Sequence, residues 1–520
     1  MSARRKVALF LLFPMVALGQ SNLVVNSLNK IQFADQFSGA DACIQIQNAI
    51  AALPANGGDV DARGFLGSQT CSVNPFANIL NRPGKSIHLY LAAGVTFVTS
   101  APWIIPQAST LTGGGRSSVG GGRATMIVAN ATAFPASMAV ISLGDVIQSQ
   151  AARVENLTID CNHVSGCIGV FSDRVQEQGG LRNISIYNYP AFGIQMLDKA
   201  TLPPRTGGQP ENYILDEVEL AGDAGSTCIN VRVGTGGQRG GGHITCTSSL
   251  VEQGNLSCSS GVVTATFASN TIPNGAAIGV ESGTNPPLNG LFTVTSSSST
   301  QLKWSQSGCR GTSTGALVGT MAQSGVRLDG SDGVYSQIHC EFTVDCVLTD
   351  SVSLQDGWIT RALAVSGVTG QASVKNIVHL SNATHPEDIV LTALQRCIGP
   401  TPATQQCATN LLQDDFSSIT LRDASLAWYL IGHSSSGAAP ALLSSSPNVG
   451  WSLPNPFLAF DNSSVFAQLR GQNNGSLTYC SDCRVATPSS CSAANPSSCV
   501  CAAGGTGAFA KRLNGRWFCN

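Results

Sequence analysis

The stretch VENLTID, residues 154–160, decides the fold because its pattern returns along the chain. It has one apolar residue, then two polar residues, then apolar and polar residues in alternation. Repeats separated by about 20–50 residues are typical of a solenoid, in which each repeat stacks on the next. The pattern therefore predicts an all-β chain that winds into a right-handed parallel β-helix. Five further segments carry all or part of the pattern: residues 181–187, 215–220, 334–338, 374–378 and 416–421.

Alternation along a strand predicts which side chains point outward. If the apolar side chains of this stretch enter the core, Thr158 and Asp160 lie on the outer surface. The next two repeats then place Ser185 and Glu219 in line with Thr158, and Tyr187 in line with Asp160. We expect this surface to accommodate an extended polymer.

A helix is expected before the first coil. Cys43, Ile46, Ile50 and Leu53 are spaced by three, four and three residues, which puts them on one helix face. Ser38 or Asp41 would cap its beginning, and Asn56, Gly57 and Gly58 would end it. Strands are expected at residues 59–62 and within 91–97.

Residues 35–100 resemble a known capping segment. The run Gly39-Ala40-Asp41, the helix IQIQNAI at 44–50, the Gly57-Gly58 pair and the Ala93-Gly94 turn are similar to the amino-terminal cap of the pectate lyase-like β-helix superfamily. This superfamily includes polygalacturonases, several polysaccharide lyases and phage tailspikes. A cap is physically needed, because the open end of a solenoid exposes apolar side chains and unpaired strand edges.

The composition limits the partners. Only 11% of the 520 residues are charged and the formal net charge is -2, so there is no basic field to attract nucleic acid or anionic lipid. With 43% hydrophobic residues the chain can bury a core, which argues against disorder. We expect neither nucleic acid nor a membrane as partner.

The first residues and the cysteines indicate export. Arg4, Arg5 and Lys6 precede an apolar run at 7–18 and a small-residue cleavage site at 17–19, so a secreted or cell-surface protein is expected, with an uncleaved anchor as the alternative. The 18 cysteines then favour disulfides over free thiols. Local pairs are expected for Cys161 with Cys167, Cys340 with Cys346, and Cys397 with Cys407.

The β-helix pattern is interrupted once and ends before the tail. Four short strands are expected at 262–267, 277–280, 291–294 and 301–304, and a disulfide between Cys258 and Cys309 could join them. They predict an inserted β-domain that acts as a spacer or binds glycan.

The last seventy residues are rich in cysteine, and disulfides are favoured there over a zinc site. The end of the chain resembles terminal hairpins of bacterial surface and phage fibre proteins. Such a tail could cap, trimerise or attach the chain. The expected regions are a signal peptide at 1–19, a cap at 20–105, β-helix at 106–246, the insert at 247–322, β-helix at 323–450 and the tail at 451–520.

The polygalacturonase fingerprint is not intact. Polygalacturonases carry Asn-Thr-Asp, Gly-Asp-Asp, Gly-His-Gly and Arg-Ile-Lys on successive coils and hydrolyse with paired carboxyl groups. Here residues 156–160 do not match the first motif, Asp223 stands alone in the second, and His243 lacks the following glycine. Hydrolysis of pectin by that mechanism is therefore not expected.

A lyase would need a cation, commonly calcium, and a base. Asp160, Asp216, Glu219 and Asp223 could supply oxygen ligands if neighbouring coils bring them together. The base would then be Arg182, Arg232 or His243. Solvated carboxylates are the alternative for each of these residues.

A second cluster follows the insert. His339 and Glu341 are two residues apart on an expected strand, so they share one face and could form an acid/base pair, while Cys340 points inward. Asp332 and Asp345 lie nearby in the sequence. The alternative is that these are ordinary surface residues.

The sequence thus predicts a secreted carbohydrate-active protein. As an enzyme it would be a polysaccharide lyase or glycoside hydrolase on an extracellular polysaccharide, with no certain cofactor. The alternative is a non-catalytic surface, adhesion or glycan-binding protein. The catalytic candidates are Asp160, Glu219, Asp223, His243, His339 and Glu341.

Overall fold

The structure is a computed structural model, and it divides the chain into two compact units. One unit comprises Met1–His385 and Gln395–Ala424, and the other comprises Pro386–Leu394 and Ser425–Asn520. The described residues are 30–82, 84–117, 124–146, 149–197, 212–232, 243–282, 284–329, 333–350, 363–381, 389–395, 397–398, 406–414, 419–421, 428–432, 441–444, 477–480, 483–485, 501–503, 508–513 and 516–519.

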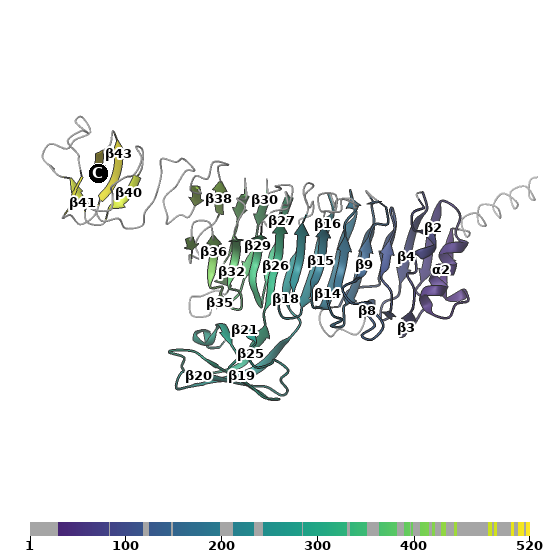
Figure 1. Ribbon diagram of the computed structural model, residues 1–520, viewed down its shortest axis with the longest axis horizontal. Coiled ribbons are helices and arrows are strands. Elements are labelled where there is room, and N and C mark those ends of the chain that lie inside the picture. The colour runs from purple at the N-terminus through teal and green to yellow at the C-terminus, as the bar shows by residue number, and fades with distance from the viewer. Residues whose placement is uncertain are drawn as a thin grey trace, which may run out of the picture. The chain divides into compact units, whose positions relative to one another are not determined.

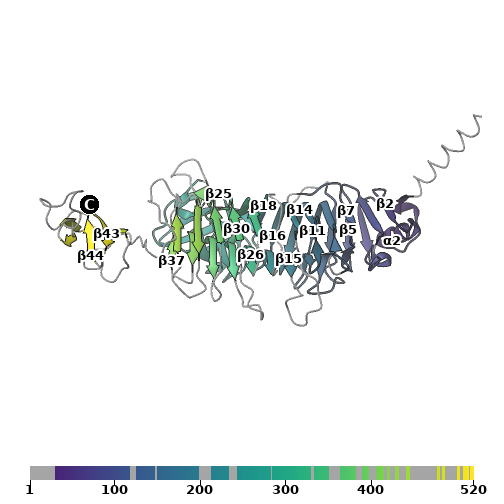
Figure 2. The ribbon, with the colours of Figure 1, turned by 90° about the horizontal axis from the view of Figure 1, so that it is seen from above.

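Two long sheets of mostly parallel strands build the first unit (Figures 1 and 2). From β11 to β18, and again from β26 to β32, the chain visits the two sheets alternately, so each turn of the chain adds one strand to each. The predicted parallel β-helix is therefore confirmed. The first sheet runs β1 (Ile31–Phe33), β2 (Gly57–Ala62), β4 (Ser86–Leu91), β7 (Thr110–Thr112), β11 (Arg153–Asp160), β14 (Gly180–Tyr189), β16 (Ile214–Gly222), β18 (Ile244–Ser248), β28 (Ile338–Cys340) and β31 (Thr369–Gly370), with β3 (Ser68–Cys71), β5 (Thr96–Thr99) and β8 (Met126–Ala129) as a side branch. The second sheet runs β6 (Trp103–Ile105), β9 (Ala139–Leu143), β12 (Ile168–Ser172), β15 (Phe192–Leu197), β17 (Thr227–Arg232), β26 (Ala322–Asp329), β29 (Thr343–Asp350), β32 (Asn376–Ser381), β36 (Asn410–Asp414) and β37 (Ile419–Leu421).

A bend within the strands explains the two adjacent polar residues of the repeat. Asn156, Asn183 and Glu217 each have a left-handed backbone, with φ of 57°, 52° and 53°. The ladder pairs the residues on either side of them, so Val154 and Leu157 both point into the core, where each is fully buried. The bend shifts the alternation by one residue, which is why the apolar spacing is three and then two.

Three of the six predicted repeats lie wholly or partly outside the first sheet. Residues 334–336 belong to β27 (Gly333–Ser336), which pairs with β30 (Leu363–Ser366) in a further sheet. Residues 374–378 lead into β32 of the second sheet, and 416–421 contains β37, which closes that sheet in antiparallel pairing with β36. Every strand of the solenoid alternates apolar and polar residues, so the pattern predicts a strand without telling which sheet it joins.

The capping helix begins as predicted and ends earlier. In α2 (Ala42–Ala52), Asp41 is the N-cap and its carboxylate accepts a 2.9 Å hydrogen bond from the Ile44 amide. Leu53 is already extended because Pro54 follows it. Gly57 therefore starts β2 and does not end the helix, which corrects the expectation. At φ +87° it lies so close to the Ser86 carbonyl that a side chain would not fit.

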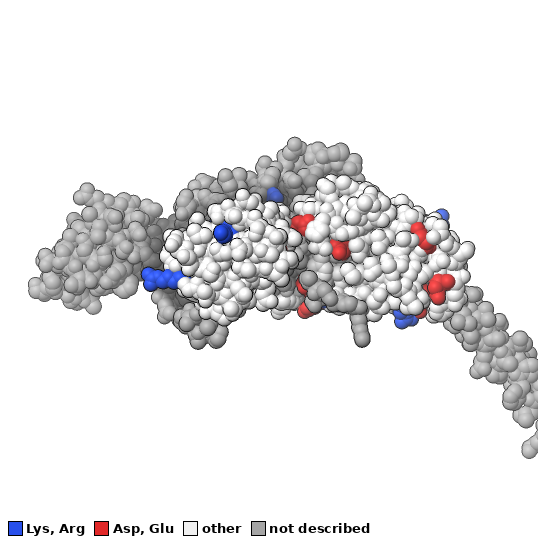
Figure 3. Space-filling view, turned by 90° about the horizontal axis from the view of Figure 1, so that it is seen from below, with Lys and Arg blue, Asp and Glu red and all other residues white. Residues whose placement is uncertain are grey.

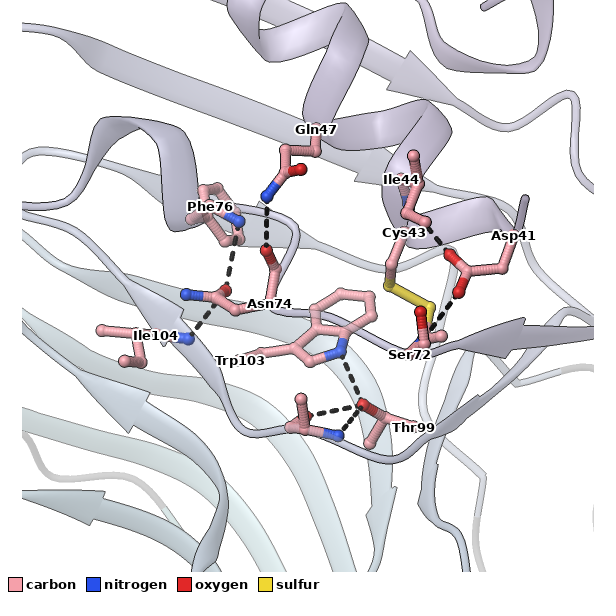
Figure 4. The surroundings of a disulfide bond; sticks show 12 residues. Asp41, Cys43, Ile44, Gln47, Ser72, Asn74, Phe76, Thr99, Trp103 and Ile104 are labelled. Atoms are coloured by element: carbon pink, nitrogen blue, oxygen red, sulfur yellow. Dashed lines mark hydrogen bonds between the residues drawn. A yellow bond between two sulfur atoms is a disulfide. The ribbon is translucent and has the colours of Figure 1, made fainter. Parts of the chain in front are cut away.

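A disulfide between Cys43 and Cys71 ties this helix to β3 (Figure 4). The second carboxylate oxygen of Asp41 accepts a 2.8 Å hydrogen bond from the Ser72 amide beside it. The helix is thus held on the end of the solenoid by one covalent and one polar link.

The insert, residues 249–321 between β18 and β26, is an antiparallel sheet in which all four predicted segments form strands. Its order is β22 (Gly290–Thr293), β21 (Ala277–Glu281), β25 (Thr312–Thr320), β19 (Val251–Ser259), β20 (Val262–Thr266), β24 (Gln301–Ser305) and β23 (Ser296–Ser297). The disulfide Cys258–Cys309 forms, and Trp304 is buried in a separate small core.

The insert packs against the solenoid through Phe342. This ring is fully buried, and a Cβ at Gly279 or Gly319 of the insert would lie 3.1 or 2.7 Å from it. Only glycine leaves room for the ring at these two positions, so the contact fixes the insert on the turn that follows β28.

The predicted local disulfides Cys161–Cys167 and Cys340–Cys346 also form. Cys407 is disulfide-bonded, and its backbone pairs with that of Cys397. Cys228 and Cys246 are free thiols in the core.

The second unit contains only antiparallel pairings among its described strands. They are β33 (Ile389–Thr392) with β38 (Trp428–Gly432) and β39 (Ala441–Ser444), β40 (Leu477–Cys480) with β43 (Ala508–Leu513) and β44 (Arg516–Cys519), and β41 (Cys483–Val485) with β42 (Cys501–Ala503). The strands β43 and β44 form the expected terminal hairpin. The tail cysteine side chains and the predicted signal peptide at 1–19 lie outside the described part.

Candidate functional site

One outward row of the first sheet crosses six coils. Ser185 and Glu219 lie in register with Thr158, and Tyr187 with Asp160, as predicted. From β11 to β31 the row is Thr158, Ser185, Glu219, Thr245, His339 and Thr369. Two catalytic candidates, Glu219 and His339, therefore belong to this row, and Glu341 follows His339 by two residues.

The beginning of the row is covered, which corrects the expectation of an open surface there. Thr158 and Ser185 are fully buried. The Ser117 amide donates a 3.0 Å hydrogen bond to the Thr158 hydroxyl, and the Tyr187 hydroxyl donates one of 2.7 Å to the Ser117 carbonyl. Burial raises the pKa of Tyr187. A ligand on this face would therefore meet the row from Glu219 onward.

Glu219 lies at the edge of this cover. Its carboxylate accepts a 3.4 Å hydrogen bond from Ser185 and lies 3.6 Å from the Arg116 guanidinium. It is two strands away from His339, which places the two Cα atoms about 10 Å apart. Glu219 is thus a charged neighbour of the His339 pair, held by the loop that covers the row.

His339 and Glu341 contact each other as predicted. The His339 Nε2 lies 3.1 Å from Glu341 Oε1, and both side chains are partly open to solvent, at 20% and 28%. On its other side the imidazole Nδ1 lies 2.9 Å from the Thr369 hydroxyl. If that hydroxyl donates, Nε2 carries the proton and donates it to Glu341.

Gln371 completes the support of Glu341. Its side-chain amide also donates to Glu341 Oε1. No described residue hydrogen-bonds Oε2, so this oxygen can accept a proton from a bound molecule. The pair therefore has the geometry of an oriented base, with His339 and Gln371 fixing the carboxylate.

A second carboxyl group reaches this cluster from the insert. Glu281 on β21 is only 4% exposed and accepts a hydrogen bond from the Ser373 hydroxyl. Burial, opposed by the Ser373 hydrogen bond and reinforced by the negative charge of Glu341, raises the pKa of Glu281 to about 7. No sequence pattern pointed to Glu281, because it lies in the insert, 60 residues before Glu341.

Asp160 and Asp223 lie at the turn that follows the first sheet, away from the His339 pair. Asp160 accepts hydrogen bonds from the Asn162 amide at 2.7 Å and the Asn188 side chain at 2.9 Å, so it holds the turn. Asp223 lies 2.9 Å from the Nδ1 of His163, which is a second histidine–carboxylate pair. The left-handed backbone of His163, with φ of 56°, is a feature that sequence reasoning missed.

The remaining candidates do not join either pair. His243 is exposed and lies 3.3 Å from the Thr245 hydroxyl. Asp345 on β29 contacts His379 at 3.1 Å and is nearly buried. Asp332 and the Arg232 side chain lie outside the described residues.

The four carboxylates suggested as cation ligands are not brought together. Asp216 pairs with Arg182 at 3.2 Å, and the other three have the separate partners given above. Within the described ranges, no group of three or more His, Cys, Asp or Glu side chains could hold a metal ion. The suggested calcium set therefore does not fit this arrangement.

An aromatic surface lies on the earlier coils. The rings of His88 and Tyr90 are 3.9 Å apart, and the Arg63 guanidinium lies 5.6 Å from the Tyr90 ring centre. Burial lowers the pKa of His88. Sequence reasoning missed this cluster, although the alternation of residues 86–91 places His88 and Tyr90 on one face.

Charged side chains are few and scattered on the face drawn in Figure 3. No helix in the described part of the chain is long and apolar enough to cross a membrane.

Comparisons with known proteins leave the function open. No family model and no curated protein matches the sequence. Among solved structures, an iota-carrageenase of family GH82 from A. fortis, crystallised without chloride ions, matches at 13% identity and a TM-score of 0.27. The match covers 69% of this chain and 56% of the carrageenase chain, so the chain spans little more than half of that protein. The function must be argued from the residues of this chain.

Proposed function

We propose that this chain is an extracellular polysaccharide-cleaving enzyme whose acid/base centre is the His339–Glu341 pair. The observation that carries the proposal is the 3.1 Å contact between His339 Nε2 and Glu341 Oε1 on a partly open face of the β-helix. A carboxylate held by a histidine and an amide, with a second oxygen that no described residue hydrogen-bonds, is suited to remove a proton.

The same pair supports two reactions. In a glycoside hydrolase, Glu341 would take a proton from water while a second carboxyl group protonates the leaving oxygen. In a lyase, Glu341 or His339 would remove the proton next to a uronate carboxylate. The glycosidic C–O bond on the adjacent carbon would then break, which leaves a double bond in one sugar, and the departing oxygen would take a proton to become a hydroxyl. The products distinguish these reactions.

An extended polymer suits the shape of the site. The outward row repeats once per coil, so a chain of sugars lying across the strands would meet similar positions at regular intervals. The disulfides are typical of proteins from oxidising compartments. The resemblance of residues 35–100 to the pectate lyase-like cap supports a carbohydrate substrate.

The test is incubation of the purified protein with a panel of acidic and neutral polysaccharides. New reducing ends would report cleavage, and absorbance of unsaturated uronate would identify a lyase. We expect Glu341→Gln to lower kcat by about 100-fold or more, because the base is lost while the fold is kept.

The matched control is the other histidine–carboxylate pair. Asp223→Asn removes a carboxylate that lies 2.9 Å from a histidine, against 3.1 Å in the His339–Glu341 pair, and we expect it to leave kcat within about threefold. If Asp223→Asn abolished cleavage and Glu341→Gln did not, the centre would lie at the turn and the proposal would be wrong.

Glycan binding without catalysis is the second candidate, supported by the His88–Tyr90 surface. Two neighbouring rings tilted by 32°, with a guanidinium over one of them, offer apolar and polar contacts that suit a sugar. In this case no polysaccharide would be cleaved, but one would bind, and Tyr90→Ala would weaken that binding.

A further inference from the structure

The inserted domain contacts the solenoid at the proposed acid/base centre. Its Glu281 accepts a hydrogen bond from the Ser373 hydroxyl, and that hydroxyl accepts one of 2.8 Å from the Phe342 amide. Phe342 directly follows Glu341, and Ser373 is two residues from Gln371, which donates to Glu341. A continuous set of hydrogen bonds and short backbone steps thus joins Glu281 to Glu341.

We propose that the insert is part of this centre and contributes Glu281 as a positioning residue for the His339–Glu341 pair. The inference rests on the proposed function. It assigns the insert a role other than the spacer or glycan-binding module that its sequence suggests.

The contacts of the insert support a fixed arrangement. The Phe342 ring packs against Gly279 and Gly319, so β21 and β25 cannot move away without exposing a buried ring. Glu281 lies at the end of β21, two residues after Gly279. The same packing that docks the insert therefore holds its carboxyl group against Ser373.

The chemical consequence concerns charge near Glu341. The titratable side chains that act on Glu281 are Glu341, which disfavours a second negative charge, and His339, which favours it. An ionised Glu281 places a second negative charge in the same partly buried cluster as the Glu341 carboxylate, which disfavours its ionisation.

The first experiment measures the electrostatic coupling between Glu281 and Glu341 and does not require a substrate. The full-length protein is labelled with ¹³C at the glutamate carboxyl carbon, and its resonances are followed between pH 4 and 9, with assignment by Glu281→Gln and Glu341→Gln. We expect the Glu281 resonance to titrate near pH 7 and the Glu341 resonance to show an inflection at the same pH. Glu281→Gln should remove the inflection from Glu341.

The matched control is Glu252→Gln. Glu252 is a carboxylate of the same insert, but it bonds Thr271 on the insert itself. We expect the Glu341 inflection to persist unchanged in this variant. An inflection that is absent from the wild type, or that survives in Glu281→Gln, would overturn the proposal.

If Glu281→Gln fails to fold, Ser373→Ala serves as the test variant in its place. The lost hydrogen bond, which lowers the pKa of Glu281, should move the Glu281 titration to higher pH, and the Glu341 inflection should move with it. Movement of the Glu281 titration alone would overturn the proposal.

The second experiment uses activity once a substrate is found. The kcat/KM of the wild type should show an inflection near pH 7 that Glu281→Gln lacks, with KM changed by less than about threefold. An unchanged pH profile in Glu281→Gln would contradict the positioning role. If no polysaccharide is cleaved, the proposed function fails, and the carboxyl titration still decides whether insert and solenoid form one cluster.

Discussion

The side-chain amide of Asn183 donates a 2.8 Å hydrogen bond to Asn156 Oδ1 on the preceding coil. Both residues have the left-handed backbone at the bend of the first sheet. Asparagine tolerates this conformation better than most residues, and its amide can also bond its neighbour above or below. The bond therefore holds adjacent coils in register at the point where the sheet turns.

Replacing Asn183 should reveal how much its hydrogen bond and its tolerance of the left-handed backbone each contribute to stability. We expect Asn183→Ala to lower the free energy of unfolding by about 2 kcal/mol, from a lost hydrogen bond and a strained left-handed alanine. Asn183→Gly loses the same bond without the strain and should cost about 1 kcal/mol less. Urea denaturation of the two variants measures the difference, and equal losses would show that the backbone is not strained.

Much of the solenoid could be predicted from sequence because its repeats are local. The stretches at 154–160, 181–187 and 215–220 stack as expected, and their register places Glu219 in line with Thr158. His339 and Glu341 were also predicted correctly as neighbours, although β28 ends at Cys340 and Glu341 lies just beyond the expected strand.

The rest of the site depends on contacts between distant segments. Glu281 meets Ser373 across 92 residues, and His163 meets Asp223 across 60. Neither contact leaves a periodic pattern, because the loops between coils vary in length. The burial of Thr158 by the segment around Ser117 was missed for the same reason.

The disulfide between Cys43 and Cys71 should stabilise the cap more than a shorter bridge would. It spans 28 residues, whereas Cys161–Cys167 spans 6. Loop-closure entropy predicts a loss of about 3.5 kcal/mol when Cys43 and Cys71 are both changed to serine, and about 2.5 kcal/mol for Cys161 and Cys167. Thermal unfolding of the two double variants tests this order, and a smaller effect at Cys43 and Cys71 would contradict it.

Cys228 and Cys246 should remain unreactive until the protein unfolds. Both thiols are fully buried, and the Tyr189 hydroxyl donates a 3.2 Å hydrogen bond to Cys228 Sγ. Burial also raises the pKa of Cys246, which lowers the fraction of reactive thiolate.

We expect iodoacetamide at pH 8 to leave both cysteines unmodified in the native protein and to modify both in denaturant. Peptide mapping by mass spectrometry identifies the labelled sites. Labelling of either cysteine in the native protein would contradict the burial, and a Cys228–Cys246 disulfide would contradict the free thiols.

The buried carboxyl group of Glu281 should make the protein less stable as the pH rises through a defined window. Its pKa is about 7 in the folded protein, against 4.5 for an exposed glutamate. Below pH 4.5 the group is protonated in both states and has no effect. Between 4.5 and 7 the unfolded chain releases the proton and the folded chain keeps it, so unfolding becomes more favourable. Above pH 7 Glu281 is ionised in both the folded and the unfolded chain, and the loss of folding stability is constant, at about 3 kcal/mol.

Glu281→Gln removes this dependence and keeps an oxygen for the Ser373 hydrogen bond. The stability of the wild type relative to Glu281→Gln should therefore fall between pH 4.5 and 7 and be level on either side. Urea denaturation of both proteins at several values from pH 4 to 8 measures it. Parallel stability curves across that range would show that Glu281 ionises as freely in the folded chain as in the unfolded one. A carboxyl group with the same proton affinity in both states does not make the free energy of unfolding depend on pH.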